Sequence, residues 1–191
     1  MSKSQESKQS QESQKSKIIF LCGFMGCGKS TVGELLAKEQ GGIFIDIDKT
    51  IETVCGKTIP QIFAERGESH FRLIESTTIG IACGIIDNDN PKLPNVTIAL
   101  GGGALTNPKN VEVIGESGTL VFIDVPFEVC YERIQSDGLE RRPIAREKSR
   151  EELQTLFNQR REIYLEHAQY TIDGNTNLNS LVERIMNNVN I

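Results

Sequence analysis

The segment from residue 23 to residue 30 constrains the fold more than any other feature of the sequence. It reads Gly-Phe-Met-Gly-Cys-Gly-Lys-Ser, follows the apolar run Ile18–Cys22 and precedes a helical pattern over Ser30–Gln40. A glycine loop between a strand and a helix binds phosphate well, because backbone N–H groups and the helix N-terminus face the oxygens. We therefore predict a triphosphate site in which Lys29 reaches the β- and γ-phosphates and the Ser30 hydroxyl ligates Mg²⁺.

Composition narrows the class of protein. The chain has 191 residues, of which 38% are hydrophobic and 25% charged, which is typical of one soluble globular domain. The net charge of −5 argues against a nucleic-acid partner. No apolar run approaches the roughly 20 residues that cross a bilayer. Five scattered cysteines without a CxxC pair favour a reducing compartment, so we expect a cytoplasmic protein, and a monomer.

The first 16 residues differ from the rest. After Met1 they are only Ser, Gln, Lys and Glu, so they have nothing to bury and we predict a disordered tail. Residues 17–191 form a single predicted domain. Within it, the charged stretch 136–148 fits neither helical nor strand periodicity, and we predict a mobile lid there.

Short apolar runs alternate with helical patterns along this domain. The predicted strands are Ile18–Cys22, Ile43–Ile47, Val96–Leu100, Thr119–Val125 and Tyr170–Ile172. The predicted helices are Ser30–Gln40, Glu68–Ile86, Pro126–Gln135, Ser149–His167 with a capping box, and an amphipathic helix from Leu178. Such alternation predicts a three-layer α/β fold around a parallel sheet.

Two aspartates follow the second predicted strand. Asp46 and Asp48 are two residues apart, so on a strand they project to the same side, at the edge where α/β proteins bind ligands. Asp46 could hold the hydration shell of a magnesium ion, and Asp48 could orient an acceptor hydroxyl and take its proton. Alternatively, Asp48 is the N-cap of a helix over Lys49–Val54.

Two arginines, Arg72 and Arg160, suggest an anionic acceptor such as a carboxylic acid. Arg72 and Glu75 are i, i+3 neighbours on one helix face, so Glu75 can hold the guanidinium in position. The alternative is a surface ion pair that contributes little. Arg160 falls near the middle of the apolar stripe of its helix, whereas Arg161 lies at the edge. A buried guanidinium needs an anionic partner, which is either a ligand carboxylate or an internal carboxylate in a structural ion pair.

Two further segments complete the candidate site. Gly101-Gly102-Gly103 ends the third predicted strand, where missing side chains let a ligand approach the backbone; a flexible turn is the alternative. Arg141 and Arg142 lie in the predicted lid and could close over the triphosphate, with Arg142 favoured by its rigid neighbour Pro143; otherwise they are solvated.

In combination and in order, these motifs resemble shikimate kinases over roughly residues 18–191. The motifs are the P-loop, Asp46-x-Asp48, Phe71-Arg72-x-x-Glu75, Gly101–Gly103, Arg142-Pro143 and Arg160-x-x-x-Tyr164. The resemblance implies a nucleoside-monophosphate-kinase-like P-loop fold with a five-stranded parallel sheet. It also implies transfer of the ATP γ-phosphate to the 3-hydroxyl of shikimate, in the route to aromatic amino acids.

The resemblance also implies roles for individual residues. Asp48, Arg72, Gly102 and Arg160 would contact shikimate, with catalysis by Lys29, Asp48 and Arg142, and Mg²⁺ at Ser30 directly and at Asp46 through water. The residues that would contact ATP are Gly26, Cys27, Gly28, Lys29, Ser30, Thr31 and Arg142.

Two features depart from the resemblance. The stretch 174–178 lacks an arginine that packs on adenine in many relatives. Cys27 stands where a small hydroxyl residue is common, at a helix N-terminus where thiol pKa values tend to fall. We therefore predict that alkylation of Cys27 inhibits and that ATP protects.

Overall fold

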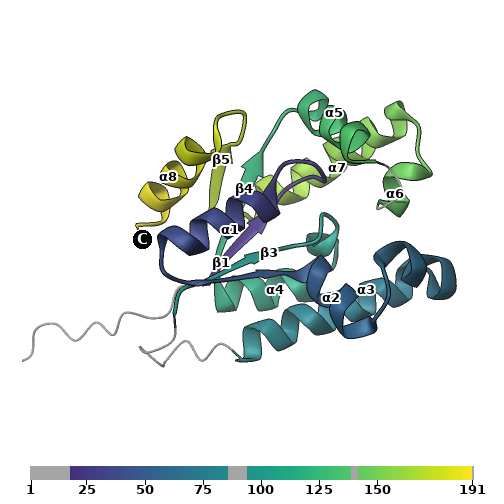
Figure 1. The fold of residues 1–191 in the computed structure, drawn as a ribbon, viewed down its shortest axis with the longest axis horizontal. Coiled ribbons are helices and arrows are strands. Elements are labelled where there is room, and N and C mark those ends of the chain that lie inside the picture. Colours follow the sequence, from purple (N-terminus) through teal and green to yellow (C-terminus); the bar gives the residue numbers. More distant parts are fainter. Residues whose placement is uncertain (1–17, 86–93, 139–141, 191) are drawn as a thin grey trace, which may run out of the picture.

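The computed structural model describes residues 18–85, 94–138 and 142–190. Its centre is a sheet of five parallel strands in the order β2-β3-β1-β4-β5 (Figure 1). The strands are β1 (Ile18–Cys22), β2 (Ile43–Asp46), β3 (Val96–Ala99), β4 (Gly118–Asp124) and β5 (Tyr170–Asp173). The predicted parallel α/β sheet is therefore confirmed, with strand ends that differ from the predictions by at most one residue.

Helices cover both faces of this sheet. They are α1 (Lys29–Glu39), α2 (Ile47–Cys55), α3 (Ile59–Ile85), α4 (Pro108–Ser117), α5 (Phe127–Asp137), α6 (Pro143–Arg146), α7 (Arg150–His167) and α8 (Leu178–Val189), with a 3-10 turn at Ala104–Thr106. In Figure 1, α1 and α8 lie together on one side, and α3 and α4 lie together on the other. The capping box that predicted the start of α7 is present, since Ser149 and Glu152 bond each other's backbone N–H.

Alternation along β1 explains why the fold has two cores. Ile19 and Leu21 face a cluster built with α1, α5, α7 and α8, whereas Ile18 and Phe20 face a cluster built with α2, α3 and α4. Successive strand residues point to opposite faces, and here both faces are buried, so β1 is apolar throughout. The loop that follows β1 is thereby anchored between the two cores.

The expected position of the two aspartates is wrong in part. We predicted a strand over Ile43–Ile47 carrying both carboxylates on one side, but β2 ends at Asp46 and Ile47 begins α2. The carboxylate of Asp46 accepts the backbone N–H of Lys49, so Asp46 is the helix N-cap. The alternative that Asp48 is the N-cap is therefore also wrong; Asp48 lies in the first turn of α2.

Helix α3 begins nine residues before the predicted helix and contains a break. Gly67 has φ 79° and ψ 170°, a conformation open essentially to glycine alone, so the chain changes direction between residues 59–66 and 68–85. The prediction missed the first half, although Ile59, Ile62 and Phe63 stand at helical spacing. It also missed α4, although Asn107 before Pro108 is an N-cap followed by proline at the first helical position.

Two predictions concern residues that lie wholly or partly outside the described part of the chain. The predicted tail, residues 1–16, lies wholly outside them, as do residues 139–141 of the predicted lid. The described part of that lid contains more helix than predicted, because α5 continues to Asp137 and α6 occupies Pro143–Arg146. Among the helices that the structure describes, none has the length and apolarity needed to cross a membrane.

Candidate active site

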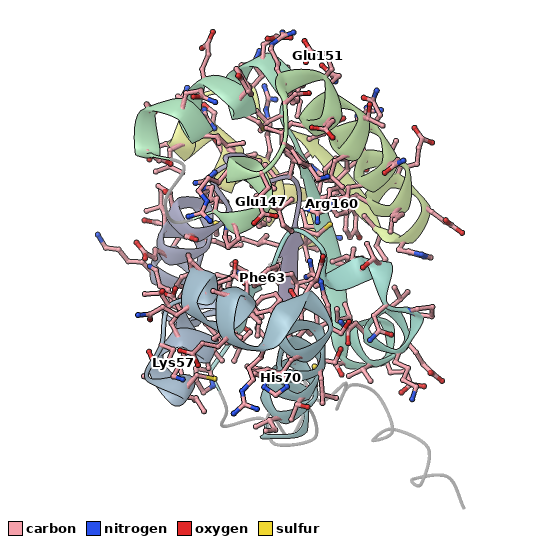
Figure 2. The ribbon with its side chains drawn as sticks, turned by 90° about the vertical axis from the view of Figure 1, so that its right-hand side faces the viewer. Lys57, Phe63, His70, Glu147, Glu151 and Arg160 are labelled. Atoms are coloured by element: carbon pink, nitrogen blue, oxygen red, sulfur yellow. The ribbon has the colours of Figure 1, made fainter. Side chains whose placement is uncertain are left out.

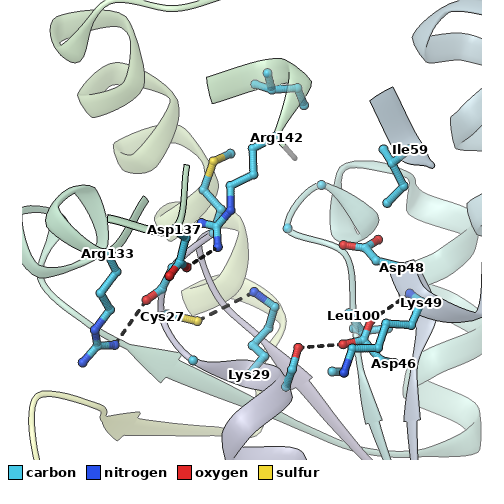
Figure 3. A pocket seen from close by; sticks show the side chains of 18 of the residues that line it. Cys27, Lys29, Asp46, Asp48, Lys49, Ile59, Leu100, Arg133, Asp137 and Arg142 are labelled. Carbon is cyan, nitrogen blue, oxygen red and sulfur yellow. Dashed lines mark hydrogen bonds and ion pairs between the residues drawn. The ribbon is translucent and has the colours of Figure 1, made fainter. Parts of the chain in front are cut away.

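The carboxyl ends of the strands open into one large cavity of about 1220 Å³. Its walls come from the glycine loop after β1, the β2–α2 junction, both halves of α3, the glycine turn after β3, and α5, α6 and α7. Figure 3 shows Lys29 between two groups of side chains, with Arg133, Asp137 and Arg142 on one side and Asp46 and Asp48 on the other. The cavity thus joins residues that are far apart in the sequence.

The phosphate loop depends on backbone conformations that other residues rarely adopt. Gly26 has φ 80°, and a Cβ there would lie 2.6 Å from the carbonyl oxygen of Cys130 on α5. The Lys29 ammonium turns back onto the loop and donates to the carbonyl oxygens of Gly23 at 2.9 Å and Phe24 at 3.1 Å. The loop therefore holds its own lysine at its centre, in reach of a phosphate that would lie there.

Ser30 and Asp46 form the oxygen pair expected of a magnesium site. The Ser30 hydroxyl donates to Oδ2 of Asp46 at 2.6 Å, which joins the start of α1 to the end of β2 (Figure 3). Among the described residues no group of three or more His, Cys, Asp or Glu could enclose a metal ion. Hard oxygen donors in so small a number suit Mg²⁺, which keeps most of its water and is shared with phosphate oxygens.

Asp48 carries a carboxylate that the protein leaves unpartnered. Its Oδ1 is buried and has no hydrogen-bond partner among the described residues. Burial, together with the negative charges of Glu75 and Asp46, raises the pKa of Asp48 to about 6, against the opposing charges of Lys29 and Arg72. A carboxylate with a raised pKa that faces a cavity has the chemistry of a general base near neutral pH.

Arg72 is held from several sides at once. It bonds Glu75 at 2.7 Å and Glu68 at 2.9 Å, and its guanidinium lies 5.2 Å from the centre of the Phe71 ring. Glu75 is only 1% exposed, so this is not the surface pair that the sequence left open. A Cβ on Gly103 would lie 2.6 Å from Nη2 of Arg72. The guanidinium is thus fixed against the glycine turn at the cavity wall.

Arg160 and Arg161 separate as the helical pattern predicted. Arg160 is 6% exposed and lines the cavity, and Figure 2 places it toward the middle of the molecule, with Glu151 of the same helix at the periphery. Its Nε has no partner, and no carboxylate of the described residues forms an ion pair with it. Arg161 instead pairs with Asp124 at 2.6 Å. Burial lowers the pKa of Arg160, and the charge of Arg72 acts in the same direction, against the opposing effects of Tyr164, Glu75 and Glu68.

The glycine turn packs closely against charged side chains of α2, α3 and α7, so it is more than a flexible connector. A Cβ on Gly101 would lie 2.2 Å from Oε1 of Glu75 and 3.0 Å from Oδ1 of Asp48. A Cβ on Gly102 would lie 3.3 Å from Nη1 of Arg160. Any larger residue at position 101 would collide with the two carboxylates, so the three glycines allow the acidic and basic groups to gather around one space.

On the other side of the cavity lie two arginines. Arg142 donates to Asp137 at 3.0 Å, and its Nη1 is buried without a partner, whereas Arg141 lies outside the described residues. Arg133 on α5 donates to the carbonyl oxygen of Gly26 at 3.2 Å (Figure 3). The sequence analysis missed Arg133 because a lone arginine on an amphipathic helix carries no signal. Only the packing of α5 on the phosphate loop brings it there.

The remaining predicted residues also lie at this end. Thr31, Thr176 and Leu178 line the cavity, so the stretch 174–178 without arginine borders the nucleotide side. Cys27 is 2% exposed and its thiol packs beneath the loop, where a Cβ on Gly23 would approach Sγ within 2.8 Å. The Lys29 ammonium lies 3.7 Å from this Sγ (Figure 3), so the buried thiol packs beside the lysine that is expected to reach the phosphates.

The sequence of this chain is similar to those of known proteins. Residues 25–190 match the family model for shikimate kinase. The shikimate kinase of Persephonella marina is 41% identical over 146 residues, covering 76% of this chain and 82% of its own. That of Aquifex aeolicus is 36% identical over 168 residues, covering 88% and 93%.

Solved structures agree. A shikimate kinase from Acinetobacter baumannii, in complex with shikimate, is similar with a TM-score of 0.81 and 33% identity, covering 91% of this chain and 92% of that one. A gluconokinase from Sinorhizobium meliloti has a TM-score of 0.51 at 17% identity and shares the fold alone. A deoxyadenosine kinase from M. mycoides, with a TM-score of 0.57 at 14% identity, likewise shows the P-loop kinase fold.

Proposed function

The chain belongs to the shikimate kinase family, and we infer that it transfers the γ-phosphoryl group of ATP to the 3-hydroxyl of shikimate. The observation that carries the acceptor assignment is that Nε of Arg160 and Oδ1 of Asp48 both lack a partner among the described residues and line the same cavity. A ligand that satisfies both must present an anion to one and a hydroxyl to the other. Shikimate is a carboxylic acid with ring hydroxyls, so it has both groups.

We propose that the acceptor is bound from three sides. Arg160 and Arg72 take its carboxylate, because a planar guanidinium binds a carboxylate through two parallel hydrogen bonds. Arg72 is already held by Glu68 and Glu75, so it adds direction, whereas Arg160 adds a buried guanidinium whose Nε has no partner among the described residues. The Gly102 backbone closes the third side, and the reacting hydroxyl then lies at Asp48.

The proposed reaction is an in-line displacement at the γ-phosphorus. The acceptor oxygen forms a bond to phosphorus, the bond from phosphorus to the β–γ bridging oxygen breaks, and ADP leaves with that electron pair. The hydroxyl proton passes to the carboxylate of Asp48. Lys29 stabilises negative charge on the β- and γ-phosphate oxygens after it exchanges the carbonyls of Gly23 and Phe24 for phosphate.

Mg²⁺ belongs to this proposal as the partner of ATP. Ser30 would ligate the ion directly and Asp46 would hold it through water, which suits the 2.6 Å contact between their oxygens. When bound, the ion neutralises phosphate charge during transfer. The residues of the chain supply orientation: Asp46 is fixed as the N-cap of α2 and Ser30 by the first turn of α1.

On the nucleotide side we propose that Arg142 moves from Asp137 to the phosphates. Its guanidinium has one buried nitrogen without a partner, which a phosphate oxygen would satisfy. The predicted lid, residues 136–148, would bring it there. The stretch 174–178 lacks arginine, and we propose that Arg133, which lines the cavity beside Gly26, borders the base instead. We also place the reaction in the cytoplasm and the chain in monomeric form, without nucleic-acid partners.

A coupled assay of ADP release tests the function. The purified protein with Mg-ATP is measured with shikimate, with gluconate and with no acceptor. We expect turnover with shikimate well above the other two, and shikimate 3-phosphate as the product by phosphorus NMR. Strong turnover with gluconate and none with shikimate would refute the acceptor assignment. Binding of ATP without any transfer would indicate a nucleotide sensor.

A further inference from the structure

Tyr164 has a buried hydroxyl with a defined partner. It lies on α7 one turn after Arg160, is 2% exposed, and its Oη donates to the carbonyl oxygen of Gly102. Its ring packs at 5.1 Å from that of Phe122 on β4. A phenylalanine would fill this place in the core equally well and bury no polar atom. The hydroxyl is therefore present for the hydrogen bond rather than for packing.

The partner of this hydrogen bond lies where both substrates meet. A Cβ on Gly102 would lie 3.3 Å from Nη1 of Arg160 and 3.7 Å from both the Gly23 carbonyl oxygen and the Met25 nitrogen. Gly102 thus lies between the acceptor arginine and the phosphate loop. With no side chain of its own to hold it, the orientation of its peptide depends on what bonds its backbone.

One helix carries both the arginine and the tyrosine. Arg160 and Tyr164 are four residues apart on α7, so they lie on the same face. When the Tyr164 hydroxyl bonds the Gly102 carbonyl, it fixes the distance between this face and the glycine turn. It also fixes the plane of the peptide that joins Gly102 to Gly103, because that bond is planar and trans.

We propose that Tyr164 is a positioning residue for the acceptor, which holds the Gly102 peptide and Arg160 at a fixed separation. This rests on the proposed function, in which Arg160 and Gly102 bind the acceptor. Tyr164 does not touch the reacting atoms. Its loss would let the glycine turn rotate away from α7, so the acceptor site would loosen while the nucleotide site kept Lys29, Ser30 and Asp46 in place.

The test is Tyr164→Phe, which removes the hydroxyl and keeps the ring. We expect the KM and the calorimetric Kd for shikimate to rise about five- to tenfold, the range of one hydrogen bond. The KM for ATP should stay within about twofold, since no contact of the phosphate loop is removed. Tyr170→Phe is the matched control, because it makes the same change on edge strand β5, and it should leave both constants unchanged.

Phe122→Leu separates the hydroxyl from the ring. It loosens the packing of Tyr164 and keeps the hydrogen bond, so it should lower the Tm and leave the ratio of the two KM values unchanged. If Tyr164→Phe changes neither constant, or changes both equally, the positioning role is refuted. The same holds if Phe122→Leu shifts the ratio as strongly. Should wild-type protein turn over no shikimate at all, the proposed function fails instead, which the wild-type assay shows first.

Discussion

The two halves of the cavity differ in how their polar groups are satisfied. On the nucleotide side the protein bonds most of its own functional groups: Lys29 to loop carbonyls, Ser30 to Asp46 and Arg133 to Gly26. The exception there is Nη1 of Arg142, which is buried without a partner among the described residues. On the acceptor side three buried atoms have no partner among the described residues, namely Oδ1 of Asp48, Oε1 of Glu75 and Nε of Arg160. The nucleotide side must break internal hydrogen bonds when ATP binds. The acceptor side instead has buried polar atoms that gain hydrogen bonds when a ligand binds.

This difference has an energetic meaning. A buried polar group without a partner costs about 1–3 kcal/mol, and more when it is charged. The acceptor half therefore lowers the stability of the free protein in return for geometry that is already correct when shikimate arrives. The nucleotide half loses little stability, but ATP must displace internal hydrogen bonds there. The predictions that follow test this contrast, from the largest expected effect to the smallest.

Asp48→Asn should have the largest effect. Without a base we expect turnover to fall by about 10²–10⁴-fold. In the wild type, kcat/KM for shikimate should fall as pH drops through about 6, where Asp48 takes up a proton, and the variant should lose this dependence. Steady-state kinetics between about pH 5 and pH 8 measure the loss of turnover and the pH dependence of kcat/KM. A variant with normal turnover would remove Asp48 as the base.

The same substitution tests the stability side of the contrast. The pKa of Asp48 is raised in the folded protein, so the folded state binds the proton more tightly than the unfolded state does between the ordinary value of 3.8 and about 6. Stability from this group is thus present at low pH and lost as pH rises through that window. We expect Asp48→Asn to raise the Tm relative to wild type at pH 8 and not at pH 4.

Lys29→Ala should reduce turnover by about 10²–10³-fold, because the phosphate charge loses its main cation. Since Lys29 also bonds Gly23 and Phe24, the free loop should become less ordered. Hydrogen exchange over residues 23–28 measures this, with Lys38→Ala on the far part of α1 as the control. If exchange is unchanged, the internal bonds of the lysine contribute nothing and the contrast between the halves is weaker than inferred.

Arg160→Met should raise the KM for shikimate about 10- to 100-fold, the range of hydrogen bonds to a charged group, with little change in the KM for ATP. It should also raise the Tm of the free protein, because it removes a buried cation whose Nε has no hydrogen-bond partner among the described residues. Arg161→Met is the control; it breaks the pair with Asp124 and should leave the KM for shikimate unchanged. A lower Tm for Arg160→Met would mean that Arg160 is satisfied after all.

Cys27 should give the smallest effect. The sequence analysis predicted alkylation with protection by ATP, and the burial of the thiol beneath Gly23 makes that reaction slow. We expect the half-exposed Cys55 to react first in mass-spectrometric mapping, and Cys27→Ser to keep kcat within about twofold. Rapid alkylation of Cys27 that saturating ATP does not slow would contradict the predicted protection and show that the loop opens on its own.

Local patterns predicted a large part of the fold. β1, the capping box of α7 and the apolar stripe of α8 follow directly from residue spacing, and the structure contains all three. The inward arginine of α7 also followed from spacing alone. These features depend on residues close in sequence, which is why periodicity reveals them.

Features that depend on tertiary packing could not be predicted. Nothing near Arg133 in sequence indicates that α5 packs on the phosphate loop, and the spacing of Asp46 and Asp48 gives no sign that a helix begins between them. The helix begins there because the Asp46 carboxylate accepts a hydrogen bond from the backbone N–H of Lys49, which competes with continuation of the strand. The ion pair between Glu68 and Arg72, in contrast, joins i, i+4 neighbours within the predicted helix and follows from spacing.

The break at Gly67 has a consequence for the size of the substrate that fits. Phe63 lies before it and Phe71 and Arg72 lie after it, and all three line the cavity. The rings of Phe63 and Phe71 pack across the break with their centroids 5.0 Å apart, and the left-handed φ of Gly67 turns the chain between them. The conformation of this one residue therefore helps to set the width of the acceptor pocket, independently of the chemistry that its walls present.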